Sequence, residues 1–421
     1  MAQRQNHIVR KLQIEVEVRD KTVNPTELQH SLSHALQSRR VEEAIEGALS
    51  EVSTPHQWIT LDKVTIDLGR ITLDKVEKLV FFEQLQALLY EQVLKQIEEV
   101  TIHPKREMKT AEDFDFDQFV FFLENGFFRV IPITDAPITG TTETQKWMEA
   151  ILLSLNETRR WILKQALLRS QEARRRIVSQ FSHSNFLLLL EQLGKLQKKT
   201  ESQLVFEPYP LPIARLKTEV MTRLAQLEQI LIETPKKEGE NVSPSNITPK
   251  TTTLKESIFI QNAGVVLLHP FINQCFKALG WIEGGRFVDE EKQQKGVLMW
   301  YFLATRQDTP AEHELVLPKI LCGLLPQYVL QPLQPLTPEE RQEGEDMLAA
   351  VIAHWSILKN TSPNGLRAEF LLREGKLEAS SDMLILTVEQ RASDILLSKL
   401  PWGISMIKLN WMSTLLYVNW F

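Results

Sequence analysis

Cysteine is scarce in this chain: only Cys275 and Cys322 occur among 421 residues. A disulfide framework is therefore excluded, and stability must come from buried apolar side chains. Both cysteines lie in apolar stretches, which fits a reducing compartment. The first residues, MAQRQNHIVRKLQ, also lack the apolar segment of a secretion signal. We therefore expect a cytoplasmic protein.

A positive charge excess and long apolar runs are lacking as well. The 48 Lys and Arg residues face 54 Asp and Glu residues, which gives a net charge of −6 and a pI near 5.9. Because binding to a nucleic-acid backbone requires a basic surface, no nucleic-acid partner is expected. Residues 257–276 carry no charge, but they contain amides, His269 and Pro270. We interpret this stretch as a buried core segment and expect no membrane insertion.

Catalytic motifs are missing too. The sequence contains no GxGxxG, Walker loop, HExxH, GxSxG or CxxC. His269, His313, Cys322 and His354 would form a zinc site only if the fold brought them together, and isolated core or capped side chains are the simpler interpretation. We expect no catalytic residues, no cofactor and no metal. A metal-dependent effector enzyme built on these four residues remains a remote alternative.

An acidic stretch has the spacing of a calcium loop in part. Asp113, Asp115, Asp117 and Glu124 occupy positions one, three, five and twelve of an EF-hand pattern, but Gln118 stands where the sharp turn requires glycine. Acidic side chains also favour the first turn of a helix, whose dipole is positive there. We interpret the stretch as a helix start.

What is present is a clear periodic pattern. Residues 8–18 alternate as a strand, a helix opens at Asn24-Pro25, a second strand is predicted over 58–68, and a long amphipathic helix covers 73–100. Residues 1–105 are therefore predicted to form a strand–helix–strand–helix unit.

The middle of the chain, residues 106–232, is predicted to be helical. Helices are expected over 119–123, 147–155, 160–169, 174–181, 185–196 and 216–232. Residues 233–256 are poor in large apolar side chains and rich in Pro, Ser, Thr and Lys, which is typical of a flexible linker.

The remaining residues, 257–421, contain the best-defined caps and turns. Gly284-Gly285 predicts a turn, and Asp289 is expected to cap a helix that runs to about residue 304. Thr337-Pro338-Glu339-Glu340 is a capping box that predicts a helix to about residue 358. Ser362-Pro363 is expected to start a short helix. A strand is predicted over 384–388, and a hairpin over 406–411 and 415–420. The fold class is thus α+β and predominantly α-helical, with a C-terminal α+β domain that ends in a β-hairpin.

Several strings resemble those of the contractile injection system tape measure proteins. They are NAGVVLLHPF at 262–271, GRFVD at 285–289, HELVLPKILCG at 313–323 and LPWGISMIKLNWM at 400–412, with the N-terminal pattern at 8–18, 58–62 and 66–70. The resemblance implies a structural role in a bacterial phage-tail-like particle. A tape measure lies in the lumen of the growing inner tube, anchored near the baseplate hub, until a terminator or cap seals the tube. No catalytic residues come with this family.

The resemblance leaves two hypotheses open within the same particle. The chain either sets or nucleates the length of the inner tube, or acts as an adaptor or chaperone that loads or caps the tube. Both imply inner tube, baseplate hub and cap proteins as partners, with assembly in the cytoplasm before incorporation into the particle.

Two groups of residues are candidates for partner binding. The C-terminal group comprises Trp402, Ile404, Lys408, Trp411 and Trp420, for which core packing is the alternative role. The second group is a basic cluster formed by Arg159, Arg160, Lys164, Arg169, Arg174, Arg175 and Arg176. A solvated helix face would explain the cluster, and docking on an acidic protein surface, tested at Arg174 and Arg175, is the alternative.

Overall fold

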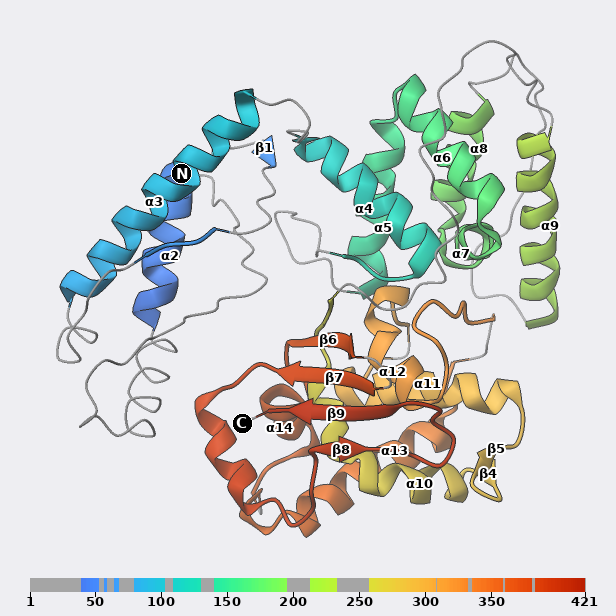
Figure 1. The fold of residues 1–421 in the computed structure, drawn as a ribbon. Coiled ribbons are helices and arrows are strands. Elements are labelled where there is room, and N and C mark those ends of the chain that lie inside the picture. The colour runs from blue at the N-terminus through green and yellow to red at the C-terminus, as the bar shows by residue number, and fades with distance from the viewer. Residues whose placement is uncertain are drawn as a thin grey trace. The chain divides into compact units, whose positions relative to one another are not determined.

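The computed structural model describes residues 39–52, 57–58, 64–67, 79–102, 109–129, 140–194, 213–232, 257–307, 309–331, 335–358, 360–380 and 383–420. The chain divides into two compact units, Met1–Phe114 and Asp115–Phe421. Figure 1 shows the elements, and each unit is described by itself.

The first unit is built on two helices, α2 (Arg39–Val52) and α3 (Leu79–Ile102). The small side chains of Ala44 and Ala48, one turn apart on α2, are buried and let α3 approach closely. Strand β1 (Gln57–Trp58) pairs antiparallel with β2 (Lys109–Thr110). The strand predicted over 58–68 is shorter than expected, because residues 64–67 lie in no regular element. The strand predicted over 8–18 lies outside the described residues.

Residues 115–232, called the helical region below, contain every helix predicted for them. These are α4 (Ala111–Asn125), α5 (Gly140–Leu153), α6 (Glu157–Arg169), α7 (Gln171–Gln180), α8 (His183–Gly194) and α9 (Ile213–Ile232). Their apolar faces form one core, in which Phe119, Leu163 and Phe186 are completely buried. The acidic stretch lies in α4, with Glu112 and Asp113 in its first turn, so the helix interpretation is confirmed.

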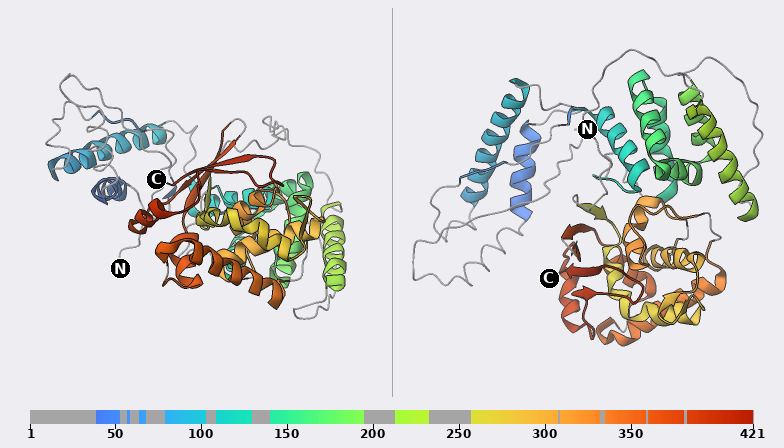
Figure 2. Two further views of the ribbon diagram at one scale, coloured as in Figure 1. Left: turned by 90° about the horizontal axis from the view of Figure 1, so that it is seen from below. Right: turned by 45° about the vertical axis from the view of Figure 1, so that its right-hand side comes forward.

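Residues 257–421, called the C-terminal region below, place a five-stranded sheet on a layer of helices (Figure 2). The order is β3 (Ile258–Ile260), β6 (Gly375–Ser380), β7 (Met383–Val388), β9 (Leu415–Asn419) and β8 (Met406–Ile407). All neighbours are antiparallel except β7 and β9. The strand predicted over 384–388 and the hairpin are confirmed, although β8 has only two residues.

The helical layer of the C-terminal region confirms the predicted caps. Its elements are η2 (Ala263–Leu268), α10 (His269–Ala278), α11 (Glu290–Thr305), η3 (Glu312–Leu315), α12 (Val316–Leu321), α13 (Pro338–His354), η4 (Ser356–Leu358), α14 (Pro363–Leu366), η5 (Arg367–Leu371) and η6 (Ala392–Lys399). Asp289 accepts the Lys292 amide at 2.7 Å, and Thr337 and Glu340 form the reciprocal capping box. Gly284-Gly285 turns between β4 (Ile282–Glu283) and β5 (Arg286–Phe287).

The uncharged stretch 257–276 supplies β3, η2 and most of α10, and all six residues of η2 are buried, as predicted for a core segment. Within the described part of the chain, no helix has the length and apolar character needed to cross a membrane. The division into 1–105, 106–232, 233–256 and 257–421 stays a prediction.

Candidate functional site

Three of the four C-terminal family-like strings are joined by hydrogen bonds to main-chain carbonyls. The indole N–H of Trp402 donates to the Leu267 carbonyl at 3.0 Å, and that of Trp411 donates to the Leu321 carbonyl at 2.8 Å. The Asn262 amide donates to the Glu314 carbonyl at 2.9 Å. Because each partner lies in a different string, the strings 262–271, 313–323 and 400–412 build one packed arrangement.

Two glycines in these strings are required by close main-chain approach. A Cβ on Gly264 would lie 1.7 Å from the Phe370 carbonyl oxygen. A Cβ on Gly323, whose φ is +78°, would lie 2.4 Å from the Trp411 carbonyl oxygen. Only glycine lets these chain segments pass so closely.

The predicted C-terminal interaction residues serve different roles in the fold. Ile404 and Trp420 are buried, and the Trp420 indole donates to Asp394 Oδ2 at 3.1 Å. Trp402 and Trp411 are half-buried against the core. Lys408 is exposed, and its ammonium donates to the Ser413 carbonyl. The tryptophans therefore have a packing role, while partner binding by these residues stays a prediction.

The basic cluster is not a solvated face, because Arg159, Lys164 and Arg176 are buried. Several of its guanidinium groups donate instead to carbonyls at the C-terminal ends of helices, where the helix dipole is negative. Arg159 and Arg160 donate to Ser154 and Leu155 after α5, Arg174 to Leu167 in α6, and Arg176 to Leu123 in α4. Arg174 is half-buried and Arg175 is exposed, so docking through this pair stays a prediction.

Arg176, Glu312 and Lys319 form a charge cluster between the helical region and the C-terminal region. Arg176 Nε lies 3.1 Å and Lys319 Nζ 2.9 Å from Glu312 Oε1. The Arg176 and Lys319 side chains are 0% exposed and that of Glu312 is 1% exposed. Burial lowers the pKa of Lys319, and the adjacent Glu312 carboxylate opposes that shift.

The main chain closes tightly around this charge cluster. Arg176 also donates to the Gln327 carbonyl, and Lys319 to the Pro326 carbonyl at 3.2 Å. Gly126, at the end of α4, has a φ of +82°, and a Cβ there would lie 2.6 Å from Glu312 Oε1. The cluster thus holds the end of α4, helix α7 and the chain around α12 together.

Glu314 makes a second polar contact between the same regions. Its Oε1 accepts the Gly140 N–H, the first of α5, at 3.1 Å, where the dipole favours a carboxylate. Its Oε2 accepts the Ala311 N–H at 2.8 Å and the Tyr301 hydroxyl at 3.1 Å. Burial and the Glu314 carboxylate together raise the pKa of Tyr301. Thr141 adds a hydrogen bond to the Thr309 carbonyl at 2.8 Å.

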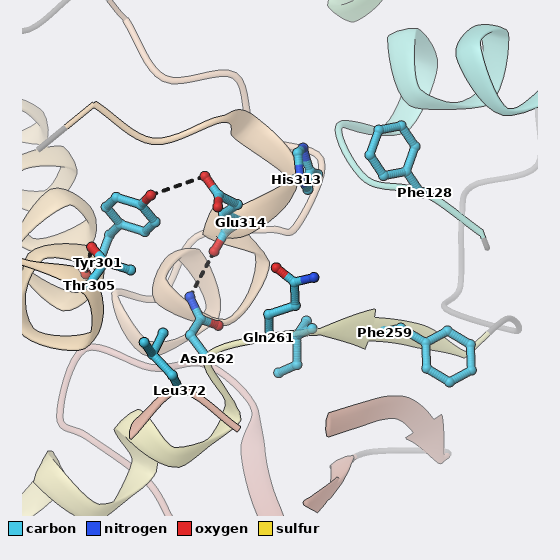
Figure 3. A pocket seen from close by; sticks show the side chains of 10 residues that line it. Phe128, Phe259, Gln261, Asn262, Tyr301, Thr305, His313, Glu314 and Leu372 are labelled. Atoms are coloured by element: carbon cyan, nitrogen blue, oxygen red, sulfur yellow. Dashed lines mark hydrogen bonds between the residues drawn. The ribbon is translucent and has the colours of Figure 1, made fainter. Parts of the chain in front are cut away.

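A small cavity lies beside Glu314, as Figure 3 shows. Its volume is about 50 Å³, and Phe128, Asn262, Tyr301 and His313 are among its lining residues. The Phe128 and His313 rings lie 4.8 Å apart, centroid to centroid. Ligand pockets usually measure about 300–1,000 Å³, so this cavity suits ordered water better than a substrate.

The four residues of the zinc alternative do not meet. His354 lies against the Phe271 ring and His269 Nδ1 lies 3.0 Å from the Val266 carbonyl, while Cys322 is buried in the C-terminal core. Across the described ranges, no group of three His, Cys, Asp or Glu side chains could hold a metal ion.

Sequence reasoning missed the charge cluster. The only local signal was the seven-residue spacing of Glu312 and Lys319, which places both on one side of a helical segment. Nothing local identified Arg176, 136 residues away from Glu312, as their partner.

Comparison with known proteins assigns the class. The family model of contractile injection system tape measure proteins matches residues 6–229 and 215–420. The chain therefore belongs to this family of structural proteins of phage-tail-like particles. No curated protein and no solved structure matches the chain significantly.

Proposed function

We propose that this chain is a non-catalytic assembly protein that sets or nucleates the length of the inner tube of a contractile injection system. The observation that carries the proposal is the family match, which extends over residues 6–420 in two overlapping stretches. The structure supports it, because three of the family-like strings pack against one another.

The size of the second unit suggests where it acts. A folded body of about 300 residues has a radius of gyration near 19 Å, which corresponds to a diameter of about 50 Å. A single helix with its side chains is only about 10–12 Å wide. We therefore propose that Asp115–Phe421 stays folded at an end of the tube. There it would contact hub, tube or cap proteins during cytoplasmic assembly and later in the particle.

A second function in the same particle is that of an adaptor that loads or caps the tube. One observation favours it: helix α9 ends at Ile232 and strand β3 begins at Ile258, and both belong to the same compact unit. While that unit stays closed, residues 233–256 do not add to the reach of the chain. Only an insertion between the two units then tests length setting.

The experiment places a helical block of about 30 residues between Thr110 and Ala111, where α4 begins close to the division of the units. At 1.5 Å per residue this block adds about 45 Å. Tails longer by that amount in negative-stain images would support length setting. The control carries the same block within 233–256, where it leaves tail length unchanged if the unit is closed. Unchanged tails from the Thr110/Ala111 insertion would refute length setting and favour the adaptor.

A further inference from the structure

The second unit contains two separate cores that follow one another in sequence. The helical core uses residues between Phe116 and Leu231. The C-terminal core uses residues between Ile258 and Trp420, together with Phe127 from the helical region. All five described strands of the large sheet come from the C-terminal region. Separation of the two regions would leave the helical core intact and would remove Phe127 from the C-terminal core, and residues 233–256 would still connect the two regions.

The contacts between the two regions are apolar as well as polar. Phe121 and Phe127 pack against the C-terminal core, and Phe128 contacts His313. The remaining described contacts include the charge cluster of Arg176, Glu312 and Lys319 and the hydrogen bonds of Gly140 and Thr141. Buried ions are thus one part of the junction.

Buried ions make such a junction separable. Two charges lose hydration when they are buried, and they regain it when the surfaces part, whereas apolar surfaces gain nothing from exposure to water. The charge cluster has two cations against one carboxylate, and Glu312 Oε2 has no hydrogen-bond partner among the described residues. It is therefore incompletely compensated, which favours its hydration.

We propose that the charge cluster is a release point, at which the helical region and the C-terminal region separate as folded bodies during tube assembly. That the separation occurs during tube assembly rests on the proposed function, whereas the ability of the two regions to separate does not. The chain would have a closed form and a longer open form.

The separation can be measured by double electron–electron resonance on the isolated full chain. Spin labels are placed at Leu187 in α8, which is 36% exposed, and at Ile395 in η6, which is 76% exposed. Cys275 and Cys322 are buried and stay unlabelled. The Arg176→Ala variant is compared with Arg175→Ala, its exposed neighbour on the same helix.

Wild type and Arg175→Ala are expected to give one narrow distance. Arg176→Ala should give a broad distribution that extends to longer distances than in the wild type, with an unchanged helical circular dichroism spectrum. A narrow wild-type distance in Arg176→Ala would overturn the proposal. Loss of the helical spectrum would overturn it too, because the cluster would then be needed to fold the region.

A triple variant, Arg176→Met with Glu312→Leu and Lys319→Met, separates charge from contact. An apolar cluster of similar volume should keep the junction closed, so this variant should show the narrow distance. A broad distance distribution in the triple variant would overturn the argument that hydration of the charges favours separation. In particles, the closed variant should assemble few or no tails while Arg175→Ala assembles normally, and normal tails from the closed variant would overturn the use in assembly.

Discussion

Replacing Gly264 by alanine tests the packing of the family-like strings most directly. The added Cβ would lie 1.7 Å from the Phe370 carbonyl oxygen, 2.7 Å from its carbonyl carbon and 2.9 Å from Leu371 Cα. Ordinary Cβ contacts begin near 3.4 Å. All three neighbours are main-chain atoms of η5, so no side chain can rotate away, and η2 and η5 must move apart.

The cost follows from what that movement disturbs. Adding a methyl group to a well-packed core usually costs about 1–3 kcal/mol when side chains absorb the strain. Here the main chain must shift between two buried segments, so we expect a loss of about 3 kcal/mol or more in the free energy of unfolding. Alanine also restricts the unfolded chain more than glycine does, and this effect offsets only about 0.4–1 kcal/mol of the lost stability.

The measurement is urea unfolding of the full chain followed by tryptophan fluorescence, since six of its nine tryptophans lie beyond residue 257. Gly403→Ala is the matched control, because its Cβ would meet nothing within 4 Å. Gly264→Ala should move the midpoint of the C-terminal transition to clearly lower urea, and Gly403→Ala should not. Equal midpoints for the two variants would refute the close-approach argument.

Three further predictions use caps, thiols and pH. Thr337→Ala removes the acceptor of the Glu340 amide and should cost about 1 kcal/mol, seen as a lower thermal midpoint, whereas an unchanged midpoint would contradict a role for the cap. Burial raises the pKa of Cys275 to about 12, so neither thiol should react with Ellman's reagent at pH 8 until urea unfolds the chain, and fast reaction of the native protein would contradict the burial. Burial raises the pKa of Asp115 to about 6 from 3.8, so the folded chain binds the proton more tightly and the free energy of unfolding should fall as pH rises from about 4 to 6. Asp115→Asn should flatten the dependence of the urea midpoint on pH over this range. The same slope in the variant and the wild type would contradict the assigned role of Asp115.

The helices could be predicted because their signals are local. Periods of 3.6 residues located α5 to α9, and side chains within three residues of the helix start fixed the caps at Asp289 and Thr337. The uncharged composition of 257–276 was likewise enough to place it in a core.

The sheet was only partly predictable, because strand pairing depends on distant segments. The alternation over 384–388 gave β7, but β6, with the sequence GKLEAS, has two exposed residues at its end and a weak pattern. Nothing in β7 indicated that its parallel neighbour would be β9.

Local signals were sufficient to predict the helices, their caps, the fold class and the family, since periodicity, capping chemistry and the family-like strings are all properties of short segments. Tertiary structure alone decided the role of the basic cluster. A run of arginines is normally solvated, and Arg176 became buried only because Glu312 and two distant carbonyls satisfy its guanidinium. The same holds for Trp402 and Trp411, whose partners are carbonyls 135 and 90 residues away. The need of a buried polar group for a partner is set by the residue, but only the fold supplies that partner.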